Sequence, residues 1–346
     1  MSHLYDEIHE QPAVIARLIS EESEPIASIA DELRRRSIRY VLIAARGTSD
    51  NAAIYGKYLF ASVLHLPVAL AAPSLYTIYH TPPRTGKDAL VVAISQSGES
   101  PDIVAVTDEA RQQGATTLAV TNELGSPLAG TAEFAISCHA GTETSVAATK
   151  TYTAQLTALG LLAAYWSEEE GKKSEIQGLP IAMEKTLALS DAVRERSDRY
   201  RYMETCLVLG RGYNYATAFE IALKLKELSY LVIEAYSSAD FKHGPIAVVE
   251  HGFPVILVAP SGAVYPDMLA LAGELTAKGA ELITLSDRRE ALEMAVTPLQ
   301  LPAAVPEWLS PMVCVIPGQL LAHDLTVAKG YDPDHPRGLC KVTLTH

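Results

Sequence analysis

Six apolar runs, each six residues long, recur along the chain between longer stretches with helical patterning. Runs of this length without polar alternation are typical of strands that are buried on both faces. Because the stretches between them are long enough for a helix, the pattern predicts βαβ units and an open parallel sheet, an α/β fold. The predicted strands are Tyr40–Ala45, Ala89–Ile94, Thr116–Thr121, Thr205–Gly210, Pro254–Ala259 and Glu281–Ser286.

The two halves of the chain carry matching residues at the ends of successive predicted strands. Arg46-Gly47 matches Arg211-Gly212 at a shift of 165 positions, and Ser97-Gly98 matches Ser261-Gly262 at a shift of 164. Asn122 corresponds to Asp287, again at 165. Self-similarity at a nearly constant offset indicates a tandem duplication.

A polar, charged stretch, Ser167–Gly178, lies between the two copies, and a helical stretch follows it to about Arg201. A domain boundary is typical of such a segment. The sequence therefore predicts four parts, which are an N-terminal helical segment (1–30), a first domain (31–170), a helical linker (171–200) and a second domain (201–346).

Composition changes the picture in one respect, through charge. The chain has 346 residues, of which 48% are hydrophobic and 20% charged, as in a folded globular protein. Its formal net charge of −13 argues against a nucleic-acid partner, which requires a basic surface. An anionic ligand would therefore have to be held by a local arrangement of donors rather than by the field of the whole protein.

Targeting, membrane and metal signals are weak. The first residues, MSHLYDEIHEQP, are acidic where a signal peptide is basic, and the apolar stretch Ala154–Trp166 is too short to span a bilayer and predicts a buried helix. The cysteines have no CxxC spacing, as expected for buried thiols in a reducing cytoplasm, and the histidines form no HxxxH or HExxH pair. We expect a cytoplasmic protein with no membrane or nucleic-acid partner and with neither metal nor cofactor. The cysteines are Cys138, Cys206, Cys314 and Cys340.

The loop after the second predicted strand is a candidate phosphate site. Its hydroxyl and amide side chains belong to Ser95, Gln96, Ser97 and Ser100, and Gly98 allows the backbone to turn so that N–H groups converge. Ser100 followed by Pro101 marks the start of a helix, whose N-terminus favours an anion. An ordinary Ser/Gly-rich strand-to-helix turn is the alternative.

Two further loops belong to the same pattern. The loop Arg46-Gly47-Thr48-Ser49 ends the preceding strand, so it would lie beside the serine loop at the carboxyl edge of the sheet. In the second copy, the serine loop corresponds to Ala259–Ala263, which has lost most of its hydroxyl groups. The first copy would then hold the phosphate, and the second would be available for other chemistry.

A charged face and a histidine are candidates for catalysis in the second half. Glu220, Lys224 and Glu227 stand at i, i+4 and i+7 of one predicted helix and so share a face. A solvated surface pair is the alternative interpretation of this spacing. His243 lies in Lys-His-Gly-Pro, beside a Gly-Pro turn signal, where a lone histidine is more often incidental than catalytic.

Taken together, these motifs resemble the sugar isomerase (SIS) domain family, and most closely the isomerase half of the glucosamine-6-phosphate synthases. The matching segments occur in the family's order and cover nearly the whole chain. They are Gly47-Thr48-Ser49, SQSGES (95–100), GTETSVAATK (141–150), EIALKLKELSY (220–230), KHGP (242–245) and HPRGLCK (335–341). The resemblance implies two flavodoxin-like αβα lobes, a phosphorylated hexose or hexosamine in the serine loop, and a homodimer in which the histidine reaches the neighbouring subunit's site.

The resemblance also implies a role for each matched residue. Glu227 resembles the carboxylate that moves a proton between C1 and C2, and Lys224 would lie near the developing enediol oxygen. His243 resembles the group that opens the sugar ring, and Lys341 the lysine that meets the open-chain carbonyl. Such chemistry needs a positioned base and a neighbouring cation. The implied sugar-binding residues are Thr48, Ser49, Glu143 and Val146.

Three departures bear on the substrate and the reaction. Ala148 and Val342 replace serines of the synthases, and Arg46 replaces a cysteine. The chain begins Met1-Ser2-His3 without the synthases' N-terminal cysteine, so we expect no glutaminase domain. The expected reaction is then isomerising deamination of glucosamine 6-phosphate. The alternatives are a plain aldose–ketose isomerase, a deglycase for a sugar–amine adduct, and a sugar-phosphate sensor without catalysis.

Overall fold

The computed structural model describes residues 2–167, 169–303 and 305–341. The chain divides into two compact units. The first lobe comprises Ala13–Glu143, Lys150–Gly178 and Cys340–His346, and the second lobe comprises Met1–Pro12, Thr144–Thr149 and Leu179–Leu339. The long helix α1 (His3–Arg35) contributes to both units.

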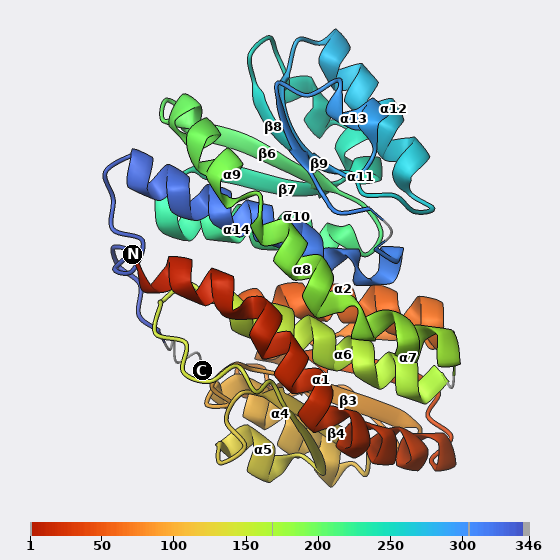
Figure 1. The fold of residues 1–346 in the computed structure, drawn as a ribbon. Coiled ribbons are helices and arrows are strands. Elements are labelled where there is room, and N and C mark those ends of the chain that lie inside the picture. Colours follow the sequence, from red (N-terminus) through yellow and green to blue (C-terminus); the bar gives the residue numbers. More distant parts are fainter. Residues whose placement is uncertain (1, 168, 304, 342–346) are drawn as a thin grey trace. The chain divides into compact units, whose positions relative to one another are not determined.

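The first lobe is built on a five-stranded parallel sheet in the order β2-β1-β3-β4-β5. The central strands β3 and β4 are buried along their whole length, which explains their uninterrupted apolar sequences. Helices α2 (Thr48–Val63) and α6 (Lys150–Ser167) cover one face, and α4 (Pro101–Gln112) covers the other with α3 (Ser74–Thr77) and α5 (Pro127–Thr131) (Figure 1). The strands are β1 Tyr40–Ala44, β2 Val68–Leu70, β3 Ala89–Ile94, β4 Thr116–Thr121 and β5 Phe134–Ser137, and α7 (Glu170–Gln177) follows α6.

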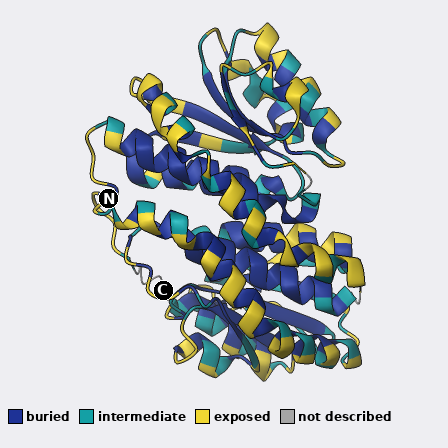
Figure 2. Cartoon of the chain, in the orientation of Figure 1, coloured by how far each residue is buried: buried dark blue, intermediate teal, exposed yellow. Residues whose placement is uncertain are grey.

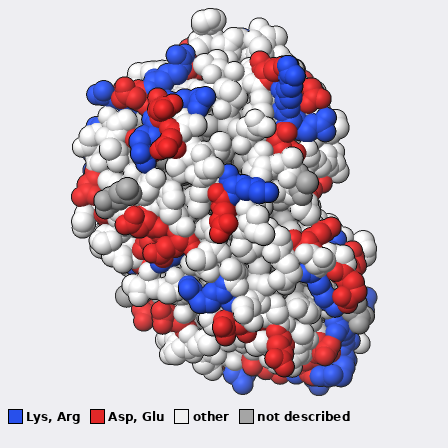
Figure 3. Space-filling view, viewed as in Figure 1, with Lys and Arg blue, Asp and Glu red and all other residues white. Residues whose placement is uncertain are grey.

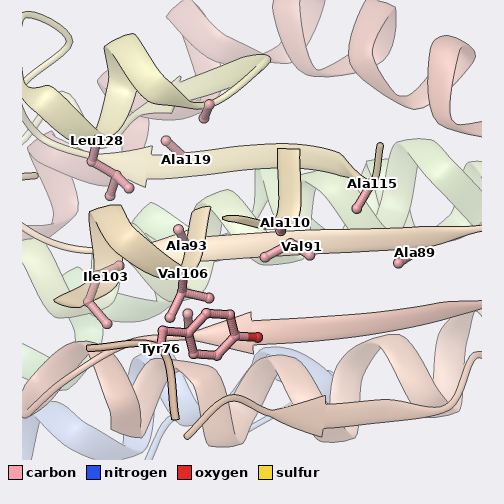
Figure 4. Close-up of a cluster of buried hydrophobic side chains, with 12 residues drawn as sticks. Tyr76, Ala89, Val91, Ala93, Ile103, Val106, Ala110, Ala115, Ala119 and Leu128 are labelled. Carbon is pink, nitrogen blue, oxygen red and sulfur yellow. The ribbon is translucent and has the colours of Figure 1, made fainter. Parts of the chain in front are cut away.

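Small side chains let α4 approach this sheet closely. Figure 4 shows Ile103 and Val106 of α4 in one buried cluster with Val91 and Ala93 of β3, and many members of this cluster are alanines. Alanine exposes little side-chain volume between the layers, so the helix backbone lies near the strands. The first turn of α4 is thereby fixed at the carboxyl edge of β3, where the serine loop runs.

The second lobe repeats this plan. Its parallel sheet has the order β10-β9-β8-β6-β7, the same arrangement as in the first lobe. Helix α10 (Asn214–Ser229) lies on one face with α14 (Ser310–Ala328) packed against it, and α12 (Tyr265–Ala277) lies on the other with α11 (Ser238–Lys242) and α13 (Arg289–Leu292) (Figure 1). The strands are β6 Thr205–Gly210, β7 Val232–Ser237, β8 Pro254–Val258, β9 Glu281–Ser286 and β10 Thr297–Gln300, and α8 (Leu179–Leu187) and α9 (Ser190–Ser197) pack on α14.

Helix α14 is a core helix. The segment Glu307–Ala328 is long and apolar enough to cross a membrane by length and composition, but 89% of its most apolar 18-residue window is buried inside the structure (Figure 2). Its Gly318 faces Ile221 of α10 so closely that an added Cβ would lie 2.3 Å from a side-chain carbon. Only glycine therefore allows α10 to pack this closely against α14 at position 318. The predicted burial of Ala154–Trp166 is also confirmed, within α6. The expected cytoplasmic location stays a prediction.

The two sheets confirm the predicted fold class and the duplication, since both follow the flavodoxin-like 2-1-3-4-5 order. All six predicted strands are present. The strands that the sequence pattern missed, β2, β5, β7 and β10, are the sheet edges, where residues are short of apolar partners and partly exposed. The predicted four-part division of the chain stays a prediction.

Surface charge is dispersed on the visible face. In Figure 3 acidic and basic side chains are interspersed, without a single basic field. The formal net charge of the whole chain is −13, so its overall field repels an anion. This distribution fits the expectation that local donors, rather than the general field, hold a phosphate.

Candidate active site

The serine loop joins β3 to α4 in the first lobe. Ser95 is buried and its hydroxyl accepts the N–H of Gly98 at 3.1 Å, while the Ser97 hydroxyl accepts the N–H of Glu99 at 3.3 Å. Ser100 is the N-cap of α4 with Pro101 at the first helical position, and its side chain makes no capping hydrogen bond. The predicted helix start is confirmed, and the Ser100 hydroxyl lies 3.5 Å from Ser95 Oγ.

Gly98 is required by the shape of this loop. Its φ of +66° lies in the left-handed region, and a Cβ there would lie 2.0 Å from the hydroxyl of Ser126. The carbonyl of Gly98 accepts the N–H of Leu128, which ties the loop to α5. Among the described residues, the backbone N–H groups of Gln96, Ser97 and Ser100 donate no hydrogen bond. The loop thus presents converging donors at a helix N-terminus.

The neighbouring loop, between β1 and α2, is fixed to the serine loop's helix. Arg46 Nε lies 2.7 Å from the carboxylate of Asp102, which is 1% exposed in the first turn of α4. Ser49 is buried and accepts a hydrogen bond from Gln155 at 3.0 Å, whereas Thr48 is partly exposed at the start of α2. Asp50 on the same turn is half-buried, and burial raises the pKa of its carboxyl although the charge of Arg46 opposes this.

Glu143 and Lys341 are brought together within the first lobe. The ammonium of Lys341 donates to Glu143 Oε2 at 2.9 Å. The same carboxylate accepts the backbone N–H and the hydroxyl of Thr151, at 3.1 and 2.8 Å, and is therefore fixed at the start of α6. Lys341 keeps 26% of its side chain exposed, while Glu143 is buried. No sequence spacing could indicate this pair, because its members lie 198 positions apart.

The predicted charged face of α10 is an ion-pair cluster in the second lobe. Lys224 is 1% exposed, and its ammonium lies 3.4 Å from Glu220 Oε1 and 2.7 Å from Glu227 Oε2. Glu220 is fully buried, whereas Glu227 keeps 24% of its side chain exposed. The interpretation as a solvated surface pair is wrong, because Lys224 and Glu220 are both buried. Burying such charges is costly unless they are paired, as they are here.

His243 lies on the surface of the second lobe. It follows the last residue of the short helix α11, and its backbone N–H donates to the carbonyl of Asp240 at 3.1 Å. The next residue, Gly244, has a φ of +145°, so the chain turns directly after the histidine. The side chain is exposed.

The second-lobe counterpart of the serine loop is closed by the protein's own carboxylates. Asp287 accepts the N–H and the hydroxyl of Ser261 at 2.7 and 2.6 Å. Glu307 accepts the N–H of Ala263 at 2.8 Å, and a Cβ on Gly262 would lie 2.2 Å from its carboxyl carbon. The donors that are open in the first lobe are therefore engaged internally in the second.

For the remaining predicted sugar-binding position and the departures from the synthases, the structure gives the exposure of the side chains. Val146 and Ala148 are partly exposed in the segment Thr144–Thr149, and Val342 lies outside the described residues.

Burial raises the pKa of the Cys206 thiol to about 12 and raises the pKa values of the Cys138 and Cys314 thiols further, so these are not thiolate nucleophiles. Cys340 is exposed, contrary to the expectation of burial. Within residues 2–341, as far as they are described, no group of three His, Cys, Asp or Glu side chains could hold a metal ion.

The chain resembles proteins of known family and structure. It is 39% identical, over 345 residues, to the isomerizing glutamine–fructose-6-phosphate aminotransferase of Thermococcus kodakarensis, covering 97% of this chain and 56% of that protein. A candidate phosphosugar isomerase from Silicibacter pomeroyi superimposes with a TM-score of 0.86 at 34% identity, covering 96% of this chain and 100% of the other.

A second solved structure extends the likeness. The C-terminal domain of a glucosamine-fructose-6-phosphate aminotransferase from Francisella tularensis gives a TM-score of 0.86 at 28% identity, with 97% of this chain and 98% of that one covered. The chain spans just over half the length of the curated relative named above. The SIS domain matches residues 32–165 and again 202–328, one match on each sheet. The chain therefore belongs to the SIS domain family, with two copies of the domain in tandem.

Proposed function

We propose that this chain acts on an amino-sugar phosphate, converting glucosamine 6-phosphate and water to fructose 6-phosphate and ammonia. The observation that carries the proposal is the pairing of Glu227 with the buried Lys224, Oε2 to Nζ, at 2.7 Å. A carboxylate can remove a proton from carbon, and an ammonium beside it can stabilise the oxyanion that forms. The aminotransferase relatives, whose names state an isomerisation of a hexose 6-phosphate, support the substrate class.

The proposed reaction balances as three proton transfers and a hydrolysis. Glu227 removes the proton from C2 of the open-chain aldehyde, and Lys224 stabilises the negative charge on the C1 oxygen. Glu227 then returns the proton to C1 while a proton of the C2 amine passes to the C1 oxygen, which leaves a hydroxyl at C1 and an imine at C2. Water adds to C2 and ammonia departs, so that C2 becomes the ketose carbonyl. No redox step occurs.

The other matched residues take supporting roles in the proposal. The serine loop, with Ser95, Gln96, Ser97 and Ser100, would bind the phosphate through hydroxyls and N–H groups, which suits an anion on an acidic protein. His243 would open the ring and Lys341 would meet the carbonyl once it exchanges its contact with Glu143. Thr48, Ser49 and Val146 would contact the sugar. A homodimer with His243 shared across the interface belongs to the same proposal.

The test is to incubate the purified full chain with glucosamine 6-phosphate and to measure ammonia and fructose 6-phosphate together. Equal amounts of both support deamination. Ketose without matching ammonia, or turnover of glucose 6-phosphate instead, would indicate a plain isomerase. Saturable binding of hexose phosphates without any turnover would indicate a sensor. Lys224→Met should abolish turnover, and Lys226→Met, an exposed lysine on the same helix, should not.

A further inference from the structure

A cavity lies within the second lobe, and the proposed function uses none of the residues that line it. Its volume is about 450 Å³, which suits a small molecule. Its walls are mostly apolar and include Tyr5, Val327 and Pro333. The polar groups that line it include Ser2, Arg194 and His323.

Three of the polar side chains at this cavity form a serine–histidine–aspartate relay. Ser2 Oγ lies 2.8 Å from His323 Nε2, and His323 Nδ1 lies 2.8 Å from Asp324 Oδ1. His323 and Asp324 are 8% and 6% exposed, so the imidazole is held between two fixed partners. When Nδ1 carries the proton and donates it to Asp324, Nε2 is free to accept the proton of the serine hydroxyl.

The serine is itself held in place. Its Oγ accepts the N–H of Tyr5 at 3.2 Å, as the N-cap of α1, and the Tyr5 ring contacts the His323 ring in a tilted arrangement with centroids 5.3 Å apart. Arg194 donates to the hydroxyl of Tyr5 at 3.0 Å and so fixes the far side of the ring. A capping serine needs no histidine, and the relay to Asp324 is therefore unexplained by capping alone.

We propose that Ser2 is an activated nucleophile that accepts an acyl group from small, apolar activated esters. Ser2 Oγ attacks the ester carbonyl while its proton passes to His323 Nε2. The bond from the carbonyl carbon to the leaving group breaks, and the leaving oxygen takes the proton from His323. The product is an acyl ester on Ser2, which water then hydrolyses through the same base.

The groups around the relay bear on the rates of acylation of Ser2 and of hydrolysis of the acyl ester. The first N–H groups of α1, on His3 and Leu4, both donate to Asp334 at 2.9 Å and are therefore not available to an oxyanion. Asp324 Oδ2 is buried and has no hydrogen-bond partner among the described residues, so the Oδ1 contact to His323 Nδ1 is the side-chain contact that orients this aspartate. We expect ready formation of the covalent adduct and slow turnover.

The test uses a fluorophosphonate probe and p-nitrophenyl acetate on the full chain. Intact mass and peptide mapping should show one adduct, on Ser2. His323→Gln should slow labelling by about 100-fold or more, and Asp324→Asn by at least about tenfold, since a positioned general base contributes factors of this size. An adduct that forms at the same rate in His323→Gln, or no adduct on Ser2, overturns the proposal.

Two controls separate this chemistry from folding and from phosphosugar turnover. Ser2→Asn keeps a capping acceptor for Tyr5 but cannot form the ester, so labelling should vanish while the unfolding midpoint and any phosphosugar turnover stay at wild-type values. Ser23, also on α1, donates to the backbone carbonyl of Ile19 and should stay unlabelled. Equal labelling of Ser23 would show that the probe reacts without activation, against the proposal.

Discussion

Arg46 and Asp102 form an ion pair of 2.7 Å between the β1–α2 loop and the first turn of α4, and the same pair recurs in the second lobe as Arg211 and Asp267, also at 2.7 Å. Arg211 and Asp267 each lie 165 positions after their counterparts in the first copy. In each copy the arginine follows the first strand of the sheet and fixes the helix that begins at the serine loop or its counterpart. The ion pair is therefore a structural element of the duplicated unit, and it explains the presence of Arg46 by a contact within this chain.

Removal of Arg46 should destabilise the protein more than removal of Arg211. Asp102 is 1% exposed, so Arg46→Ala leaves a buried carboxylate unpaired and should cost about 1–3 kcal/mol of unfolding free energy. Both members of the second pair are 37% exposed, and Arg211→Ala should cost less than about 1 kcal/mol. Urea unfolding of both variants measures this. Equal losses would contradict the assigned effect of burial.

The Arg211–Asp267 pair should make the free energy of unfolding depend on pH in the acidic range. Burial works to raise the pKa of Asp267, but hydrogen bonds from Ser238 and from Arg211 outweigh it and hold the pKa below its ordinary value. The stabilisation is therefore complete above the unfolded-state pKa of about 3.9, and it is lost as pH falls through the lower folded-state pKa. The difference in unfolding free energy between wild type and Asp267→Asn should be constant near neutral pH and narrow in acid. A difference that widens in acid would show the opposite shift.

Glu307 should stabilise the second lobe by occupying the loop before α12. Glu307→Ala leaves the N–H groups of Ala263 and Val264 without their carboxylate, and we expect a loss of about 1 kcal/mol in urea unfolding. Glu307→Gln keeps one acceptor oxygen and should lose less. If both variants matched wild type, the carboxylate would have no capping role.

Glu227→Gln should separate binding from chemistry. The amide cannot accept the C2 proton, so exchange of that proton with deuterated solvent, followed by NMR, should fall by at least about 100-fold. Binding of the sugar phosphate, measured by calorimetry, should change little, whereas Ser97→Ala should weaken it. Glu250→Gln, an exposed glutamate of the same lobe, is the control. Retained exchange in Glu227→Gln would show that the base is another residue.

Mixed dimers test whether His243 acts across an interface. Glu227→Gln and His243→Ala should each be inactive alone. If the histidine serves the neighbouring subunit, random mixing restores one complete site in half of the dimers, or about a quarter of wild-type activity. If it serves its own subunit, no mixed dimer contains a complete site, and the mixture stays inactive.

Pattern and position along the chain were sufficient for the repeated architecture. The six central strands are buried on both faces, and burial on both faces produces apolar runs that a single sequence displays. The matched strand ends predicted the duplication because both copies kept the turn residues their backbones need. The edge strands β2, β5, β7 and β10 escaped prediction because an edge strand has partners on one side only and tolerates polar residues.

The candidate site divides in the same way. The sequence alone predicted the serine loop, its helix start at Ser100–Pro101 and the shared face of Glu220, Lys224 and Glu227, since each depends on spacing within one element. Only the tertiary structure decided that Lys224 is buried rather than solvated and that Glu143 holds Lys341. It also decided that Glu307 fills the second loop. These relationships join residues far apart in the chain, where no local periodicity records which side chains the packing will bring together.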